Sequence, residues 1–217
     1  MTGNALKLIA VVCMVIDHVA WAFVPAWSVP WMAMHFVGRI TMPVMAFMIV
    51  EGYIHTHDFT RYALRLLVFA LISDVPFMAF ERSTGMHNVM FTLFLGLMAI
   101  RLIDMARNEF AAFLLCSLVV VVSVFTGVDW SFIGVLLCVT FWQFRGNFLA
   151  IVLLVSTLAF MAAMVYGQYF QFGLLFALPL LRFYNGQRGS QSRFSKWGFY
   201  WFYPAHLAAL AALRAVI

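Results

Sequence analysis

Ionisable side chains lie deep inside the first apolar stretch of the chain, residues 7–23. The stretch reads KLIAVVCMVIDHVAWAF, with Lys7 at its start and the adjacent pair Asp17 and His18 well inside it. A charged side chain at the centre of a membrane helix costs about 2.5–3.5 kcal/mol, so such residues normally face a cavity or one another and serve a function. Imidazole exchanges protons near neutral pH. The pair is therefore a candidate for proton-transfer chemistry; structural hydrogen bonds are the alternative explanation.

The spacing of Lys7 and His18 places both side chains on one face of a helix. Eleven residues make about three α-helical turns with a rise of roughly 16 Å, and they return to almost the same azimuth. Asp17 points about 100° away from His18, so the two side chains cannot share one partner. The first helix is thus predicted to offer a cation at one edge and an imidazole deeper in the same groove. Asp17 remains available to a neighbouring helix.

The second apolar segment, residues 36–54, brings further polar groups into the membrane region. Arg39 follows Gly38, which allows a close helix approach, and Pro43 releases a backbone carbonyl because it has no amide hydrogen. We expect a helix whose first turns are irregular and carry a buried cation.

Glu51 and His55, near the end of this segment, are four residues apart and can pair on one helix face. The run HTHD at residues 55–58 alternates in a way that suits a strand better than a helix, and no cysteine converges on it in the sequence. We therefore predict no metal site there.

Three later segments also carry polar residues. Asp74 precedes Val75 and Pro76, so a helix kink is expected where the acid lies. Asn88 is placed to cap the next helix, for which capping is the simpler role. The last apolar segment contains Tyr203 and His206, and His206 is expected to face the interior of the bundle.

The elements that position these residues are predicted to be membrane helices. Of 217 residues, 65% are hydrophobic and only 10% are charged, whereas roughly a quarter of the residues of a soluble domain are charged. Apolar segments of about 15–20 residues are typical of helices rather than barrel strands. The expected segments are about 6–24, 36–54, 62–80, 88–105, 110–126, 129–144, 147–166, 169–183 and 198–216. The sequence predicts an all-α polytopic membrane helix bundle of about nine transmembrane helices, in a single domain over residues 1–217.

Lys and Arg are distributed unevenly between the two ends of these helices. With the N-terminus inside, ten of the 13 lie on the inner side, and the outer ones are Arg39, Arg82 and Arg214. The positive-inside rule then predicts a cytoplasmic N-terminus and an outside C-terminus. The net charge of +5 follows from this orientation and does not indicate nucleic-acid binding. The first segment is expected to be a membrane helix, because no small-x-small cleavage site follows a short apolar core.

Five stretches, in order along the chain, resemble the TraX family of conjugative F-pilin acetylation proteins. They are KLIAVVCMVIDH (7–18), VGRITMPVMAFMIVEGYIHT (37–56), FALISDVPF (69–77), NVMFTLFLGL (88–97) and FYPAHL (202–207). The resemblance implies an N-acetyltransferase of the bacterial inner membrane, a multi-pass protein surrounded by lipid. Its expected donor is acetyl-CoA, and its expected acceptor is the N-terminal alanine of a mature pilin subunit.

The first helix also resembles, more distantly, membrane acyltransferases that modify O-antigen and peptidoglycan sugars. Those proteins carry a basic residue, ten further residues and then a histidine. Lys7 and His18 fit this spacing, with Lys in place of the more usual Arg. Lys keeps the positive charge but lacks the two-pronged guanidinium that matches phosphate.

The resemblance implies roles for the polar residues, because acetyl transfer from a thioester to an amine needs a base, oxyanion donors and cations for the CoA phosphates. His18 is the expected base, Asp17 or Asp74 would orient it or bind the ammonium group, and Arg39 would stabilise charge on the outer side. The expected CoA-binding residues are Lys7, Glu51, His55, Arg188 and Arg193, in a basic inner region with Arg182 and Lys196. The expected acceptor-binding residues are Asn88, Tyr203 and His206, and no metal is expected.

Two other functions are compatible with the same buried polar residues. One is a transporter or channel for a small acid or lipid intermediate, against which the absence of an inverted repeat in the sequence argues. The other is a non-catalytic membrane chaperone that holds pilin. Binding of acetyl-CoA distinguishes an acyltransferase from both.

Overall fold

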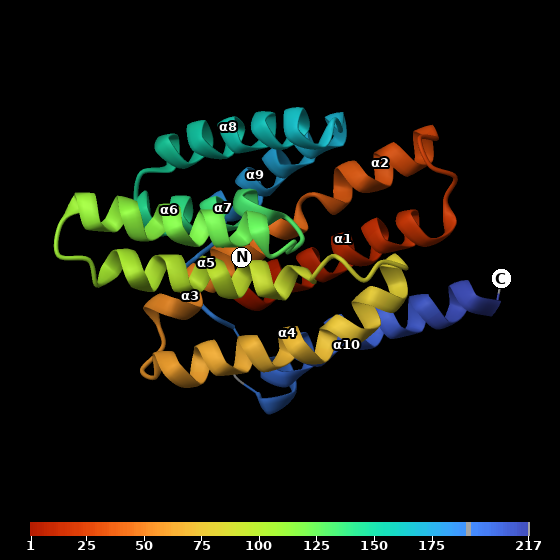
Figure 1. Cartoon of the computed structure of the whole chain (residues 1–217), viewed down its shortest axis with the longest axis horizontal. Helices are drawn as coiled ribbons and strands as arrows, with labels where there is room; N and C mark the ends of the chain where they lie inside the picture. Colours follow the sequence, from red (N-terminus) through yellow and green to blue (C-terminus); the bar gives the residue numbers. More distant parts are fainter. Residues whose placement is uncertain (190–191, 217) are drawn as a thin grey trace. The chain divides into compact units, whose positions relative to one another are not determined.

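The computed structural model describes residues 1–189 and 192–216, apart from the side chains of residues 193–196. These residues form helices and no β-strand, apart from one bridge between His87 and Val128. The α-helices are α1 (Gly3–Phe23), α2 (Val29–Gly38), α3 (Thr41–Ile54), α4 (Phe59–Glu81), α5 (Val89–Asp104), α6 (Glu109–Phe125), α7 (Ser131–Gln143), α8 (Phe148–Tyr166), α9 (Ala177–Arg182) and α10 (Arg193–Val216), and η1 (Tyr169–Phe176) is a 3-10 helix (Figure 1). The predicted all-α fold is confirmed.

Short polar side chains fix where several helices begin. Thr2, Ser28, Asp58 and Asn147 each accept a hydrogen bond from the backbone amide three residues ahead, at the starts of α1, α2, α4 and α8. The first amides of a helix have no partner within it, and a side-chain oxygen supplies one. Local sequence thus accounts for where these four helices begin.

The second predicted segment differs from the observed structure. It was expected to begin at residue 36 as one helix, but α2 already begins at Val29, and a break at residues 39–40 separates it from α3. Ser28 caps α2 and Pro30 lies in its first turn, where a missing amide hydrogen costs nothing. The break follows from Pro43, which cannot donate a hydrogen bond to the carbonyl of Arg39.

The segment predicted as a helix over residues 169–183 consists of η1 followed by the short helix α9. Gly173 of η1 approaches α2 so closely that an added Cβ would lie 2.0 Å from the carbonyl oxygen of Phe36. Only glycine allows this approach. The last segment, expected from residue 198, begins five residues earlier as α10.

Four helical stretches of the described residues are long and apolar enough to cross a membrane: Gly3–Phe23, Val29–Ile54, Phe59–Glu81 and Phe148–Tyr166. Large apolar side chains are exposed on their outer faces, for example Val68 on α4 and Leu153 on α8. Such faces suit contact with lipid, in which apolar exposure carries no penalty. The protein is therefore a membrane protein, while the nine-crossing topology stays a prediction.

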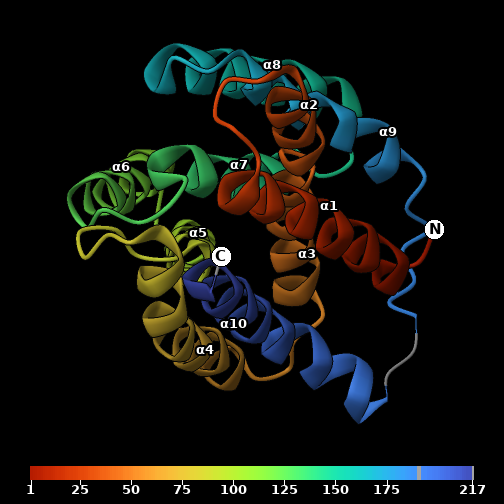
Figure 2. The ribbon, with the colours of Figure 1, turned by 90° about the vertical axis from the view of Figure 1, so that its right-hand side faces the viewer.

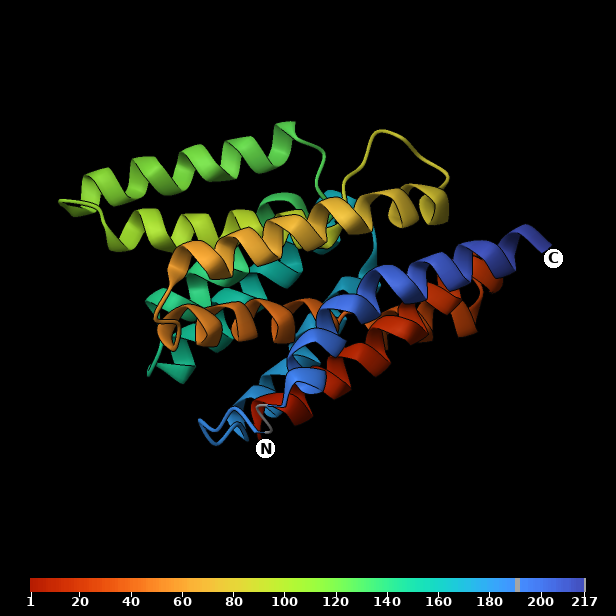
Figure 3. The same cartoon turned by 90° about the horizontal axis from the view of Figure 1, so that it is seen from below.

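The chain folds into two compact units, residues 1–45 with 147–217 and residues 46–146, with the boundary inside α3. In the first unit α1 packs against α2 and α10, and η1 packs against α2 and α8 (Figures 2 and 3). Ala20, Trp31 and Phe170 form a buried cluster there. In the second unit α5 packs against α4, α6 and α7. The first unit contains most of the predicted site residues.

Candidate functional site

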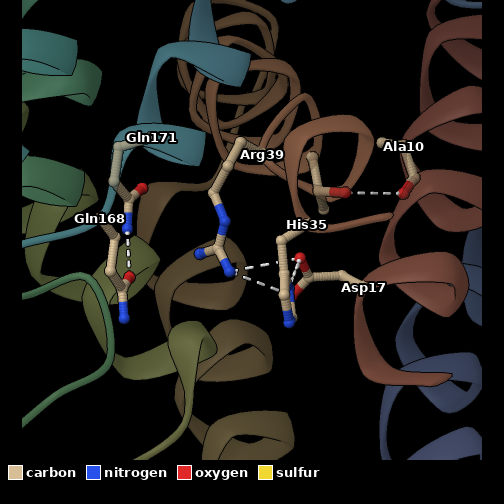
Figure 4. Close-up of polar contacts among 7 residues, drawn as sticks. Ala10, Asp17, His35, Arg39, Gln168 and Gln171 are labelled. Atoms are coloured by element: carbon tan, nitrogen blue, oxygen red, sulfur yellow. Dashed lines mark hydrogen bonds and ion pairs between the residues drawn. The ribbon is translucent and has the colours of Figure 1, made fainter. Parts of the chain in front are cut away.

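Asp17 is the centre of a buried ionic cluster between α1 and α2. Its Oδ1 lies 2.8 Å from Nδ1 of His35, and Nη2 of Arg39 donates to Oδ1 and Oδ2 at 3.2 and 3.4 Å (Figure 4). The side chains of Asp17 and Arg39 are only 13% and 10% exposed, and that of His35 is fully buried. A buried carboxylate stays ionised where a cation and hydrogen-bond donors surround it, as Arg39 and His35 do here.

Gly38 makes this contact possible. A Cβ added at Gly38 would lie 2.1 Å from Oδ1 of Asp17, well inside van der Waals contact. The close helix approach predicted for Gly38 is therefore confirmed. Thr41 also joins the start of α3 to α1, because its hydroxyl donates to the carbonyl oxygen of Ala10 at 3.0 Å.

The hydrogen bond to Asp17 fixes the tautomer of His35. An ionised carboxylate only accepts hydrogen bonds, so Nδ1 of His35 carries a hydrogen, and in the neutral imidazole Nε2 then carries the lone pair. No hydrogen-bond partner of Nε2 is present among the described residues. Three aromatic rings surround the imidazole: Trp31 at 4.2 Å, Trp21 at 4.8 Å and Phe170 at 5.0 Å between ring centroids.

His18 contacts α10 rather than α2. Its Nδ1 lies 2.7 Å from Nε2 of His206, and the two rings stack with centroids 5.0 Å apart. Nδ1 of His206 lies 3.0 Å from the carbonyl oxygen of Phe202, which only accepts. His206 therefore donates from Nδ1 and accepts at Nε2, so His18 donates from Nδ1 and carries its lone pair on Nε2. Asp17 and His18 thus serve different helices, as their spacing predicts.

Lys7 lies on the same face of α1 as His18, since both meet α10. Its Nζ lies 5.5 Å from the ring centroid of Phe199, which precedes His206 on α10 by about two helical turns. Arg188 is near enough for its charge to act on Lys7. The segment holding Arg188 is tied to the start of the chain, because the amides of Gly3 and Asn4 donate to the carbonyl oxygens of Gln187 and Arg188 at 2.8 and 3.0 Å.

Two residues of the predicted basic region, Arg193 and Lys196, have side chains outside the described part of the structure. Arg182 lies over the ring of Phe148, 5.6 Å from its centroid. Tyr203 is 6% exposed and its ring lies 5.5 Å from that of His206. The structure thus brings Tyr203 and His206 to His18. Their role in binding an acceptor stays a prediction.

Asp74 and Asn88 lie in the second unit. Asp74 accepts hydrogen bonds from Nδ2 of Asn88 at 3.0 Å and contacts Nδ1 of His87 at 2.9 Å. Asn88 caps α5 by accepting from the amide of Met90 at 3.1 Å, which confirms its predicted capping role. α4 continues through Pro76 to Glu81. The catalytic role of Asp74 and the substrate-binding role of Asn88 stay predictions.

Glu51 and His55 also lie in the second unit and pair as their spacing predicts. Nδ1 of His55 lies 2.8 Å from the backbone oxygen of Glu51 and 3.9 Å from its carboxylate. No group of three or more His, Cys, Asp or Glu side chains within the described residues is arranged to hold a metal ion. Their part in CoA binding stays a prediction.

His35 and Gln171 are the site residues that the sequence analysis missed. His35 is four residues before Arg39, so both lie on the face of α2 that meets Asp17. That i, i+4 spacing of two ionisable residues was the available signal. Gln171 lies in η1 and is 3% exposed. In the sequence it is one amide within an apolar segment, and nothing in that segment marks it as a site residue.

Comparison with known proteins places the chain in a family. The family model described as TraX protein matches residues 2–214. The chain belongs to the TraX family. It is also 38% identical, over 109 residues, to the probable fimbrial assembly protein FimC, serogroup H1, of Dichelobacter nodosus. That match covers 44% of this TraX-family chain and 43% of the relative, so the chain spans less than half of the relative's length. No solved structure matches it significantly.

Proposed function

We propose that this TraX-family protein is an inner-membrane acetyltransferase that transfers acetyl from acetyl-CoA to the N-terminal amine of a pilin subunit. Family membership over residues 2–214 supports a pilus-related role. The observation that supports acetyl-transfer chemistry is the His206–His18 pair. The carbonyl of Phe202 fixes the tautomer of His206, and His206 in turn fixes the tautomer of His18, so that Nε2 of His18 carries the lone pair. A base oriented by a third group is the recurring arrangement of acyl-transfer sites.

The donor is proposed to bind at the start of α1. Lys7 and Arg188 keep two positive charges close to each other, and such a pair is stabilised when an anion binds between them. The first amides of α1 already donate to Gln187 and Arg188, so the cations rather than the helix end would hold the CoA phosphates. The distance of about three turns between Lys7 and His18 then brings the thioester of an extended CoA toward His18.

Asp17 and Arg39 are proposed to assist acetyl transfer from the face of α1 that meets α2. Arg39 keeps Asp17 ionised and adds positive charge close to the place where a tetrahedral oxyanion would form. Asp17 and Arg39 are buried, and a site with little water strengthens such charge interactions.

A non-catalytic role in pilus assembly is the second candidate function, favoured by the similarity to a probable fimbrial assembly protein of Dichelobacter nodosus. The purified protein in detergent separates the two. It should bind radiolabelled acetyl-CoA and acetylate a synthetic peptide with a free N-terminal alanine, and Lys7→Gln should weaken the binding. A folded, monodisperse protein that neither binds acetyl-CoA nor acetylates the peptide would contradict the acetyltransferase proposal and leave the assembly role as the candidate to test.

A further inference from the structure

We propose that His35, held by Asp17, accepts the proton of the incoming ammonium group, so that the aromatic surroundings of His35 form the acceptor subsite. This inference rests on the proposed acetyltransferase function. It adds a second catalytic imidazole to the site, on a helix that the spacing of Lys7 and His18 does not involve.

The first observation is the unpartnered nitrogen of His35. The imidazole is fully buried, its Nδ1 donates to Asp17, and its Nε2 has no hydrogen-bond partner in the described structure. A buried polar atom without a partner is costly, so each such atom calls for an explanation, and a ligand or a catalytic role is one that fits an imidazole nitrogen. The lone pair of Nε2 requires a donor, so the missing partner is a donor such as an ammonium group.

The second observation is the chemistry of the walls. Trp21, Trp31 and Phe170 surround His35, and aromatic faces attract cations. Gln171, next to Phe170, is 3% exposed, and its Oε1 is a second buried acceptor for which the described residues supply no partner. In Figure 4 it lies across Arg39 from His35. A peptide N-terminus offers an ammonium and backbone amides, which are donors of the kind these acceptors need.

The third observation is the exposure of the tryptophan side chains near His35. Trp21 covers His35 and is itself 39% exposed, and Trp27 in the loop before α2 is 63% exposed and lies 5.2 Å from Trp31 between centroids. Trp21 is therefore the exposed ring that would have to rotate for an acceptor to reach the imidazole. The loop of residues 24–28 is predicted to lie on the outer side, where a processed pilin exposes its N-terminus.

The two imidazoles divide the two protons of the reaction. The ammonium group gives one proton to Nε2 of His35, and Asp17 stabilises the resulting imidazolium. The freed amine lone pair forms the C–N bond to the acetyl carbonyl, and the C–S bond breaks with its electron pair on sulfur. The second proton passes from the attacking nitrogen to Nε2 of His18 and on to the CoA thiolate. The products are an acetamide and CoA thiol, and His35 releases its proton to water.

A substitution that replaces Nδ1 of His35 with another donor and removes Nε2 tests the proposal. His35→Asn keeps an amide near the position of Nδ1, so it can still donate to Asp17, but it removes Nε2. We expect acetyl-CoA binding to stay within twofold of the wild type and transfer to the alanine peptide to fall about 10²–10⁴-fold, as for loss of a general base. His57→Asn, at an exposed loop position, is the control for the exchange itself.

The pH profile separates catalysis from a structural role. Because His35 takes the proton from the ammonium group, transfer by the wild-type protein should already proceed at pH values where the peptide amine alone is still protonated. In His35→Asn the residual kcat should keep rising until the peptide's own α-amino group deprotonates, at about pH 8. Normal transfer, or slow transfer with an unshifted profile, would overturn the proposal for His35. A wild-type protein without transfer would instead refute the acetyltransferase function itself.

Discussion

Asp17 determines how the polar residues of the first unit are arranged. One carboxylate pairs with Arg39, fixes the tautomer of His35 and, by pointing away from His18, leaves that imidazole to His206. A buried charge network of this kind is worth little as net stability but is costly to break, because removal of one partner leaves the other charge unpaired. The network therefore constrains which substitutions the site tolerates.

A double-mutant cycle on Asp17 and Arg39 should show strong coupling. Asp17→Asn leaves Arg39 buried without its carboxylate and should lower the free energy of unfolding by about 3–5 kcal/mol. Arg39→Met together with Asp17→Asn removes both charges and should recover much of that loss. Thermal or denaturant unfolding in detergent measures the four proteins. Additive losses in the double variant would show that the two side chains do not form the ion pair.

The sequence predicts these residues only in part. The shared face of Lys7 and His18 follows from one helix and is confirmed by their common contact with α10. The partners of Asp17 depend on how close α1 and α2 come, which helical periodicity does not contain. His35 was missed for this reason, although its spacing from Arg39 was visible.

At the scale of elements, α1 presents polar residues on two faces, each of which contacts a different helix. One face meets α2 through Asp17, and the other meets α10 through Lys7 and His18. Helix ends were predictable where Ser, Thr, Asn or Asp residues cap them. The early start of α2 had such a signal in Ser28 and Pro30, which the sequence analysis did not use. The 3-10 form of η1 had none, since it accompanies the close contact of Gly173 with Phe36.

Gly38→Ala should displace the carboxylate of Asp17. The new methyl group would overlap Oδ1 at 2.1 Å, so α1 and α2 must separate or Asp17 must rotate away from His35. We expect at least tenfold slower acetyl transfer to the alanine peptide and a lower midpoint of thermal unfolding in detergent. Gly198→Ala, in α10 with nothing within 4 Å of the added carbon, is the matched control. Equal activity of both variants would contradict the role of this contact.

The segment of residues 183–189 is held against the start of α1 by backbone hydrogen bonds, so changing its side chains should not move it. If Arg188 contacts the CoA phosphates, Arg188→Gln should raise the KM for acetyl-CoA several-fold, leave kcat near normal and flatten the dependence of KM on salt. Removing Arg193 as well should enlarge the effect. Arg145→Gln, at another exposed cation of the predicted inner side, is the control. An unchanged KM would leave Arg188 with an orienting role alone.

At the scale of the whole molecule, membrane orientation determines which substrate reaches which residue. Lys7 meets Phe199 and His18 meets His206, so α1 and α10 run parallel. A parallel first and last helix is what the predicted odd number of crossings requires. The backbone contacts of Gln187 and Arg188 also place their loop on the same side as the N-terminus, in agreement with the positive-inside prediction.

Cysteine labelling tests this orientation. In a background lacking Cys13, Cys116 and Cys138, a membrane-impermeant thiol reagent added outside should label Ala26→Cys and Thr84→Cys but not Gln187→Cys. All three positions are exposed, so access depends on the side of the membrane. Permeabilised cells, in which all three should react, supply the control. Labelling of Gln187→Cys from outside would reverse the assignment of donor and acceptor sides.

The most direct test is the intact mass of a pilin subunit co-expressed with this protein in a host that lacks other TraX-family members. With the wild-type protein the mature pilin should gain the mass of one acetyl group at its N-terminal residue. With His18→Ala, produced at the same membrane level, nearly all of the pilin should stay unmodified, since a general base contributes about 10²–10⁴-fold. Unmodified pilin with the wild-type protein, or full acetylation with His18→Ala, would contradict the account.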